Sequence, residues 1–516
     1  MTAPTLTRPT PLRPAATTRR DRLRAGLTRH RADLLVAAAL LLVVGLAQGI
    51  NFDGYPWRLN DDEGTYGAQA YAFLEHGRLS HYTYWYDHPP FGWMTIAAYA
   101  WLTDGFDRAP TAVTVVREAM LVATVVACGF LYLLLRRLDL PRYAAAAAVL
   151  LFGLSPVAIF FHRLGFLDNL EMAWTLAAFA VIASPRRSLG SVFAGALLFA
   201  AAVLTKETAG ILLPALLWLL AQRHRPGHRG WAFAVFLPTF VAVGCLYPLY
   251  AILKNELFEG PGHVSLIGAL KWQLVDRESS GSLLDPGSVT HALTRSWLDV
   301  DGWLLLGALA LLPAAMAVRT LRPFGLAYGL QILLMCRGGY LPQAYVISLL
   351  PFAAIIIAGT GAALWSWRPA PRRTAGRAAV LTALLVFAVA GAPAWASALH
   401  TATTQNPSVY SRQATQWIKD NVPRDATIVV DDNIWTDLER AGYTRQTWLY
   451  KVDLDPEVNA TLLPNGYRDI EYVILLQLPP DMLKGMPTLV QAIDNSHVVT
   501  TFGEGNAKIV VRKVDR

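Results

Sequence analysis

The chain has 516 residues, of which 54% are hydrophobic and only 16% are charged, and its mean hydropathy is +0.34. This composition is too apolar for a soluble enzyme of that length and indicates a membrane protein with several spans. The net charge of +8 is carried mostly by arginines in short segments between apolar runs. Because these arginines do not form one basic face, nucleic acid is not expected as a partner.

The amino-terminal segment, residues 1–33, carries eight arginines among proline, threonine and alanine. This composition predicts a disordered basic tail, and the arginines predict that it stays in the cytoplasm. The apolar run at residues 34–50 is too well separated from the start of the chain for a signal peptide and is interpreted as an uncleaved first span.

The predicted fold class is a polytopic α-helical membrane protein of about eleven spans, with a transmembrane domain at residues 34–399. A helix rises about 1.5 Å per residue and must cross about 30 Å of hydrocarbon. Arginines in every second intervening segment place the amino terminus inside, and an odd number of spans places the carboxy terminus outside. The candidate spans are approximately residues 34–50, 112–135, 143–161, 170–184, 189–205, 208–222, 231–253, 302–318, 324–336, 341–365 and 378–398.

The remaining residues, 400–516, have the composition of a small extracytoplasmic α/β domain. Asp431 and Asp432 end a buried strand and are interpreted as a solvated turn, with metal binding as the alternative. The pattern predicts strands at residues 426–431 and 471–476, helices at 410–421 and 435–441, and a hairpin at 496–514.

The first outer loop, residues 51–111, contains three adjacent carboxylates, Asp61, Asp62 and Glu63. One aspartate could simply cap a helix at residues 64–76, because an Asp side chain accepts backbone N–H bonds there. One cap needs only one carboxylate, so the remaining charge indicates binding or proton transfer at the membrane edge.

Farther along this loop, residues 81–93 are dense in aromatic and ionisable side chains. Aromatic rings also form belts at membrane interfaces. The His88-Pro89-Pro90 triplet is more particular, because two prolines restrict the backbone that carries the histidine.

Two later outward turns carry isolated cations. Lys206 lies between two apolar runs, against the positive-inside bias, and this position favours a bound anion over a surface pair with Glu207. Arg337 and Tyr340 lie in the turn before a late span and could contact phosphate and line a site, or anchor the interface. Residues 254–301 are interpreted as a possible amphipathic lid.

These motifs together resemble membrane glycosyltransferases of the C superfamily, above all the protein O-mannosyltransferase and lipid A aminoarabinose transferase group. The resemblance covers about the first 400 residues. It is carried by Asp62-Glu63, His88-Pro-Pro, an Arg-x-x-x-x-Asp segment from Arg163 to Asp168, and Tyr340-Leu-Pro. The group uses polyprenyl-phosphate sugars as donors.

The resemblance implies a role for each matching residue. Asp62 corresponds to the general base, Glu63 to its partner and Asp168 to a second active-site carboxylate. Donor phosphate would be bound by Arg163, for which interfacial snorkelling is the alternative, and by Lys206 and Arg337. The expected lining of the site is Tyr66, His88 and Tyr340.

The expected reaction transfers a sugar, with inversion, from the lipid-linked donor to an acceptor hydroxyl on a protein, lipid or polysaccharide outside the cell membrane. No nucleotide-binding glycine motif is present, and no cofactor is expected. The alternative is a divalent metal held by Asp62, Glu63 and Asp168. Two other functions stay open: a transporter or flippase of lipid-linked sugars, and a non-catalytic cell-envelope assembly factor.

Overall fold

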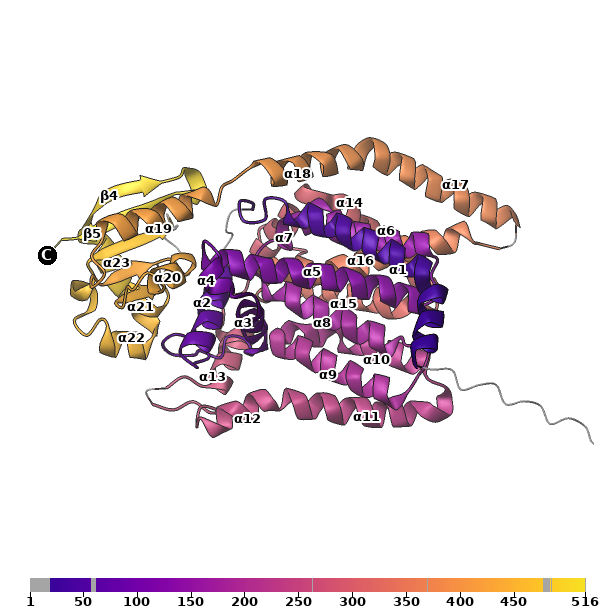
Figure 1. Ribbon diagram of the computed structural model, residues 1–516, viewed down its shortest axis with the longest axis horizontal. Helices are drawn as coiled ribbons and strands as arrows, with labels where there is room; N and C mark the ends of the chain where they lie inside the picture. The colour runs from indigo at the N-terminus through magenta and orange to yellow at the C-terminus, as the bar shows by residue number, and fades with distance from the viewer. Residues whose placement is uncertain are drawn as a thin grey trace, which may run out of the picture.

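The structure, a computed structural model, describes residues 19–56, 62–261, 263–368, 370–476, 483 and 485–515. Asp61 therefore lies outside the described residues. A large helical bundle carries a small sheet domain at one end, formed by the carboxy-terminal part of the chain (Figure 1). This arrangement confirms the predicted combination of a mostly helical protein with a small C-terminal sheet domain.

Every predicted span falls in a helical region of the structure. Among the described residues, six helices are long and apolar enough to cross a membrane, so the count of eleven spans and their orientation stay predictions. The helices of the bundle are α1 (Arg19–Gly49), α5 (Ala112–Arg137), α6 (Arg142–Leu154), α7 (Pro156–Phe161), α8 (Leu167–Ile182), α9 (Leu189–Thr205), α10 (Leu213–Arg223), α11 (Pro226–Gly244), α12 (Leu246–Leu253), α14 (Val289–Ala317), α15 (Arg322–Cys336), α16 (Val346–Trp365), α17 (Ala370–Val386) and α18 (Ala392–Thr404).

The first helix corrects one sequence-based boundary. Residues 19–33 belong to α1, although the sequence predicts them as part of a disordered tail. Alanine, leucine and arginine favour helix, and extending an existing helix costs much less than starting a new one.

Burial differs strongly between the inner and outer helices. In an apolar 18-residue stretch within Gln343–Trp365, which contains α16, 83% of the residues are buried, against 6% in such a stretch within Ala370–Asn421. The helices α17 and α18 run along one side of the bundle and α11 and α12 along the opposite side (Figure 1). Leu381, Leu384 and Leu385 of α17 are exposed, as expected for a helix whose surface faces lipid.

The first loop folds over the end of the bundle as α2 (Asp62–Glu75), α3 (Phe91–Thr103) and α4 (Gly105–Arg108). The helix predicted at residues 64–76 is thus present and begins with the acidic pair itself. Between α2 and α3 the aromatic segment runs without regular secondary structure.

The carboxy-terminal domain contains a five-stranded sheet in the order β2-β1-β3-β5-β4. Strand β1 is parallel to β2 and β3, whereas β5 is antiparallel to β3 and β4. The predicted strands, helices and terminal hairpin are confirmed. Their bounds are α19 (Val409–Asn421), β1 (Ile428–Val430), α20 (Asp432–Glu439), β2 (Gln446–Trp448), α21 (Lys451–Leu454), α22 (Pro456–Thr461), β3 (Tyr472–Leu476), α23 (Pro487–Asp494), β4 (Ser496–Phe502) and β5 (Ile509–Val514).

The turn after β1 is not solvated, so that interpretation of Asp431 and Asp432 is wrong. Both side chains are buried. Asp431 accepts a hydrogen bond from the backbone N–H of Leu476 at 2.9 Å, and the Thr65 hydroxyl donates to Asp432. The pair is covered because the domain packs directly on α2.

The contact between this domain and the first loop is close. A Cβ atom on Gly64 would lie 2.2 Å from the backbone nitrogen of Asn433, so only glycine allows the two helices to approach this far. The Tyr82 hydroxyl donates to the Gln446 carbonyl at 2.6 Å, and the backbone N–H of Ala112 donates to the Asp437 carboxylate at 2.9 Å. These bonds fix the domain to the middle of the first loop and to the start of α5.

Candidate active site

A cavity of about 1140 Å³ lies between the first loop, the α9–α10 turn, the segment before α16, and the carboxy-terminal domain. Its size exceeds that of ordinary small-molecule pockets, as a site for a lipid-linked substrate and a second reactant would require. Six of the nine residues predicted for the site line it, namely Asp62, Tyr66, His88, Lys206, Arg337 and Tyr340.

Lys206 directly follows α9 and reaches across to the first turn of α8. Its Nζ donates to Asp168 Oδ2 at 2.6 Å, and both side chains are buried. Burial alone would lower the pKa of Lys206, but the carboxylates of Asp168, Asp62 and Glu207 raise it overall. The wall of the cavity therefore carries a buried lysine–aspartate ion pair.

His88 forms the second ion pair of the wall. Its Nδ1 lies 3.0 Å from Glu207 Oε2, so Glu207 pairs with His88 and not with Lys206. Burial alone would lower the pKa of His88, but Glu207 and Asp87 raise it above its ordinary value. The Tyr84 hydroxyl donates to the His88 carbonyl at 2.6 Å, which together with Pro89 and Pro90 holds the turn in place.

Asp62 and Tyr66 face the cavity from the first turns of α2. Residues four apart lie on the same face of a helix. The buried Tyr66 ring is stacked parallel to Trp93, with centroids 6.5 Å apart, and lies 6.2 Å from the His88 ring. This packing fixes the helix that presents the Asp62 carboxylate.

Glu63 points away from the cavity. Its carboxylate accepts from Arg117 Nη2 and Arg117 Nε, both at 2.9 Å, and from the backbone N–H of Gly165 at 2.8 Å. The Glu63 and Arg117 side chains are almost fully buried. The pair thus ties α2 to α5 and to the segment that leads into Asp168.

Arg163 also lies away from the cavity. Its guanidinium donates to the carbonyls of Ala402 at 3.0 Å and Ala47 at 2.6 Å. Arg163 is therefore not among the residues that line the cavity, whereas Lys206 and Arg337 are. Its buried position and these acceptors connect the turn between α7 and α8 to α1 and α18.

The alternative metal site of Asp62, Glu63 and Asp168 is not assembled in this arrangement. Glu63 is bound by Arg117 and Asp168 by Lys206. A metal ion would have to displace both buried cations before it could use these carboxylates.

The carboxy-terminal domain contributes part of the cavity wall, and the sequence interpretation missed this. Trp448 and Lys451 line the cavity together with Trp85. Lys451 Nζ bonds Asp455 Oδ2 and the Thr83 carbonyl, each at 2.7 Å, and lies 4.3 Å from the centre of the Trp85 ring. The pattern that could have revealed this wall is the pair of aromatic residues Trp448 and Tyr450 at the end of a strand.

The loop interpreted as a lid does border the cavity. It contains α13 (Leu266–Lys271) and continues to Arg277, whose guanidinium carbon lies 3.2 Å from the centre of the Tyr340 ring. Arg277 and Tyr340 both line the cavity. The cation–π contact joins this loop to the turn that carries Arg337.

Comparison with known proteins gives a family match over part of the chain and a shared fold over most of it. Residues 87–252 match the family described as dolichyl-phosphate-mannose-protein mannosyltransferase. The fold is similar to the crystal structure of ArnT from Cupriavidus metallidurans bound to undecaprenyl phosphate, with a TM-score of 0.62 and 15% identity over 93% of this chain and 97% of that one. No curated protein matches the chain in sequence.

A second similar structure is the archaeal oligosaccharyltransferase AglB from Archaeoglobus fulgidus, in complex with an inhibitory peptide and a dolichol-phosphate. Its TM-score is 0.52, with 12% identity over 91% of this chain and 74% of that one. The family match supports the resemblance inferred from the motifs over residues 87–252, and the similar structures confirm the predicted fold over most of the chain.

Proposed function

We propose that the chain transfers a sugar from a polyprenyl-phosphate donor to an acceptor hydroxyl, with inversion at the anomeric carbon. The observation that carries this proposal is the single cavity that joins the Asp62 carboxylate to the cations Lys206 and Arg337. A base on one side and phosphate-binding charges on the other are what an in-line displacement requires.

Asp62 takes the proton of the acceptor hydroxyl as its oxygen attacks the anomeric carbon. The bond from that carbon to the phosphate oxygen breaks, and its electron pair leaves with the lipid phosphate. No cofactor takes part in this step as we propose it. Glu63 acts as a positioning residue, because its bonds to Arg117 and Gly165 hold Asp62 and Asp168 on adjoining elements.

Lys206 and Arg337 stabilise the charge that grows on the leaving phosphate. Fixed cations in a site with little water are worth far more than the same charges in solution. Asp168 keeps Lys206 protonated and aimed at the cavity. His88, held by Glu207, and Tyr340, held by Arg277, complete the surrounding wall.

The acceptor is expected to enter beside the carboxy-terminal domain, where Trp448 and Trp85 line the cavity. Aromatic faces suit apolar or sugar-ring surfaces, and a protein, a lipid or a polysaccharide hydroxyl all fit this chemistry. The arginine distribution favours a multi-pass protein of the cell membrane with the site and this domain outside the cytoplasm.

The test is a set of turnover measurements on purified protein with a panel of polyprenyl-phosphate sugars, following release of lipid phosphate. Asp62→Asn should abolish turnover, whereas Asp107→Asn, an exposed carboxylate of the same loop, should leave it unchanged. Full turnover by Asp62→Asn would contradict the base assignment. Transbilayer movement of the donor in liposomes without sugar release would instead support a flippase.

A further inference from the structure

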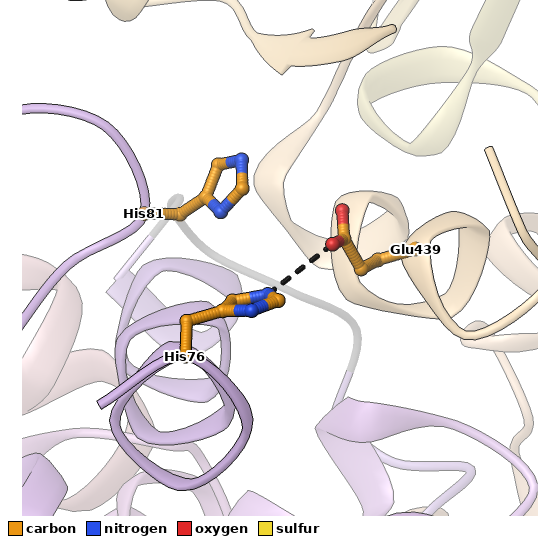
Figure 2. Close-up of side chains that lie close together, drawn as sticks. All are labelled: His76, His81 and Glu439. Carbon is orange, nitrogen blue, oxygen red and sulfur yellow. Dashed lines mark ion pairs between the residues drawn. The ribbon is translucent and has the colours of Figure 1, made fainter. Parts of the chain in front are cut away.

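A cluster of three side chains outside the cavity joins the first loop to the carboxy-terminal domain. His76 follows α2, His81 lies in the aromatic segment, and Glu439 ends α20. Their three potential ligand atoms all lie within 4.8 Å of one another. Figure 2 shows the two imidazole rings and the carboxylate converging on one space, with His76 Nε2 3.3 Å from Glu439 Oε1.

We propose that His76, His81 and Glu439 bind a divalent transition-metal ion, Zn²⁺ above all, which clamps the first loop to the carboxy-terminal domain. This proposal is independent of the proposed transferase chemistry, because none of the three residues lines the cavity.

The ligand set and the spacing suit zinc. Two imidazoles and one carboxylate form a recognised zinc set, with bonds of about 2.0–2.2 Å in tetrahedral geometry and one position left for water. Tetrahedral bonds of that length place ligand atoms about 3.3 Å apart, which is the separation of His76 and Glu439. No two of the three ligand atoms are more than 4.8 Å apart.

Neighbouring side chains hold two of the proposed ligands in position. The Gln446 side-chain amide donates to Glu439 Oε2 at 2.6 Å, which leaves Oε1 directed at His76. The Trp435 ring packs on His81 with centroids 4.2 Å apart. Such outer contacts orient metal ligands and raise metal affinity.

The imidazole of His81 is half-buried beside the ring of Trp435. Within the described part of the chain its nitrogens take part in no hydrogen bond, so a lone pair is available.

The position of the cluster explains what the ion would do. His81 directly precedes Tyr82 and Thr83, which bond Gln446 and Asp455 of the carboxy-terminal domain. The same segment then runs to His88 in the cavity wall. A bound ion adds a third link between the first loop and the carboxy-terminal domain and opposes their separation.

The experiment uses the full chain in detergent, stripped with a chelator and then titrated with ZnCl₂ by calorimetry. One equivalent should bind, and His81→Ala and Glu439→Gln should each weaken binding at least tenfold. Glu439→Gln keeps the hydrogen bond with Gln446, so it removes the carboxylate ligand without removing this contact. His497→Ala, an exposed histidine of the same domain, is the matched control and should bind normally.

Two further measurements separate this site from others. Zinc should raise the melting temperature of the wild type and of Asp62→Asn, but not of His81→Ala. Co²⁺ in place of zinc should give the visible absorption of a tetrahedral nitrogen–oxygen site, and Glu439→Gln should lose it. Absence of stoichiometric binding, equal binding by the His76→Ala/His81→Ala double variant, or loss of binding in Asp62→Asn would overturn the proposal.

Discussion

Replacing Glu63 by glutamine should destabilise the protein strongly while leaving the chemistry of each folded molecule largely intact. Arg117 would stay buried with its charge unpaired, keeping only carbonyl acceptors such as those of Phe52 and Pro56 at 3.0 Å. Breaking a buried ion pair by removing one partner costs roughly 3–5 kcal/mol. Because the amide oxygen still accepts one or two of the three bonds, we expect about 3 kcal/mol, the low end of that range, or roughly a 150-fold shift of the unfolding equilibrium.

The assay combines melting temperature in detergent with lipid-phosphate release per folded molecule. Glu118→Gln is the matched control, because Glu118 pairs with Arg108 in the same region but at the surface, where ion pairs contribute little. The double variant Glu63→Leu/Arg117→Leu should recover part of the lost stability, since an apolar pair no longer buries an unpaired charge. Normal stability of Glu63→Gln with turnover reduced a hundredfold would refute this reasoning and make Glu63 a catalytic residue.

Three further predictions concern the cavity and the contact between α2 and the carboxy-terminal domain. Lys206→Met should lower turnover by about 10²–10³-fold, the usual effect of removing one stabilising donor, as measured by lipid-phosphate release. The folded-state pKa of His88 is raised above 6.5, the ordinary histidine value. The ion pair with Glu207 should therefore stabilise the fold fully below pH 6.5, and this stabilisation should be lost as the pH rises through the folded-state pKa. Melting curves of His88→Gln and the wild type at several pH values measure this loss. Gly64→Ala should loosen the carboxy-terminal domain by about 1–3 kcal/mol through overpacking, seen as faster proteolysis between α18 and α19.

Each of these changes has a control. Lys206→Met leaves Asp168 buried without its partner, so Lys206→Met/Asp168→Asn should restore stability but not turnover; recovery of turnover would remove Lys206 from the reaction. A pH dependence of stability that is unchanged in His88→Gln would assign it to another group. Gly227→Ala, where an added Cβ meets no atom within 4 Å, should resist proteolysis like the wild type, and equal behaviour of Gly64→Ala would contradict the close contact.

The sequence determined the elements that local patterns control. Apolar runs identified the helical regions from α1 to α18, and alternating and turn residues identified β1, β3 and the terminal hairpin. Short motifs also identified Asp62, His88 and Lys206, because ionisable side chains beside apolar runs carry a free-energy cost and usually mark a functional site.

The tertiary structure decided which of the singled-out residues meet. Sequence distance carries no information on the partner of a buried charge, so Glu63 could not be assigned to Arg117, nor Arg163 to the carbonyls of Ala47 and Ala402. Ion pairs are formed by side chains that packing brings within a few ångströms, and packing is set by contacts along the whole chain.

The role of the carboxy-terminal domain also depended on the three-dimensional arrangement. The sequence by itself determined a small α/β unit after the last apolar helix. Only the close approach at Gly64 placed that unit on α2, and with it Trp448 and Lys451 in the cavity wall and Glu439 beside His76 and His81. The physical reason is that steric fit between two distant surfaces is not encoded in any local pattern of either one.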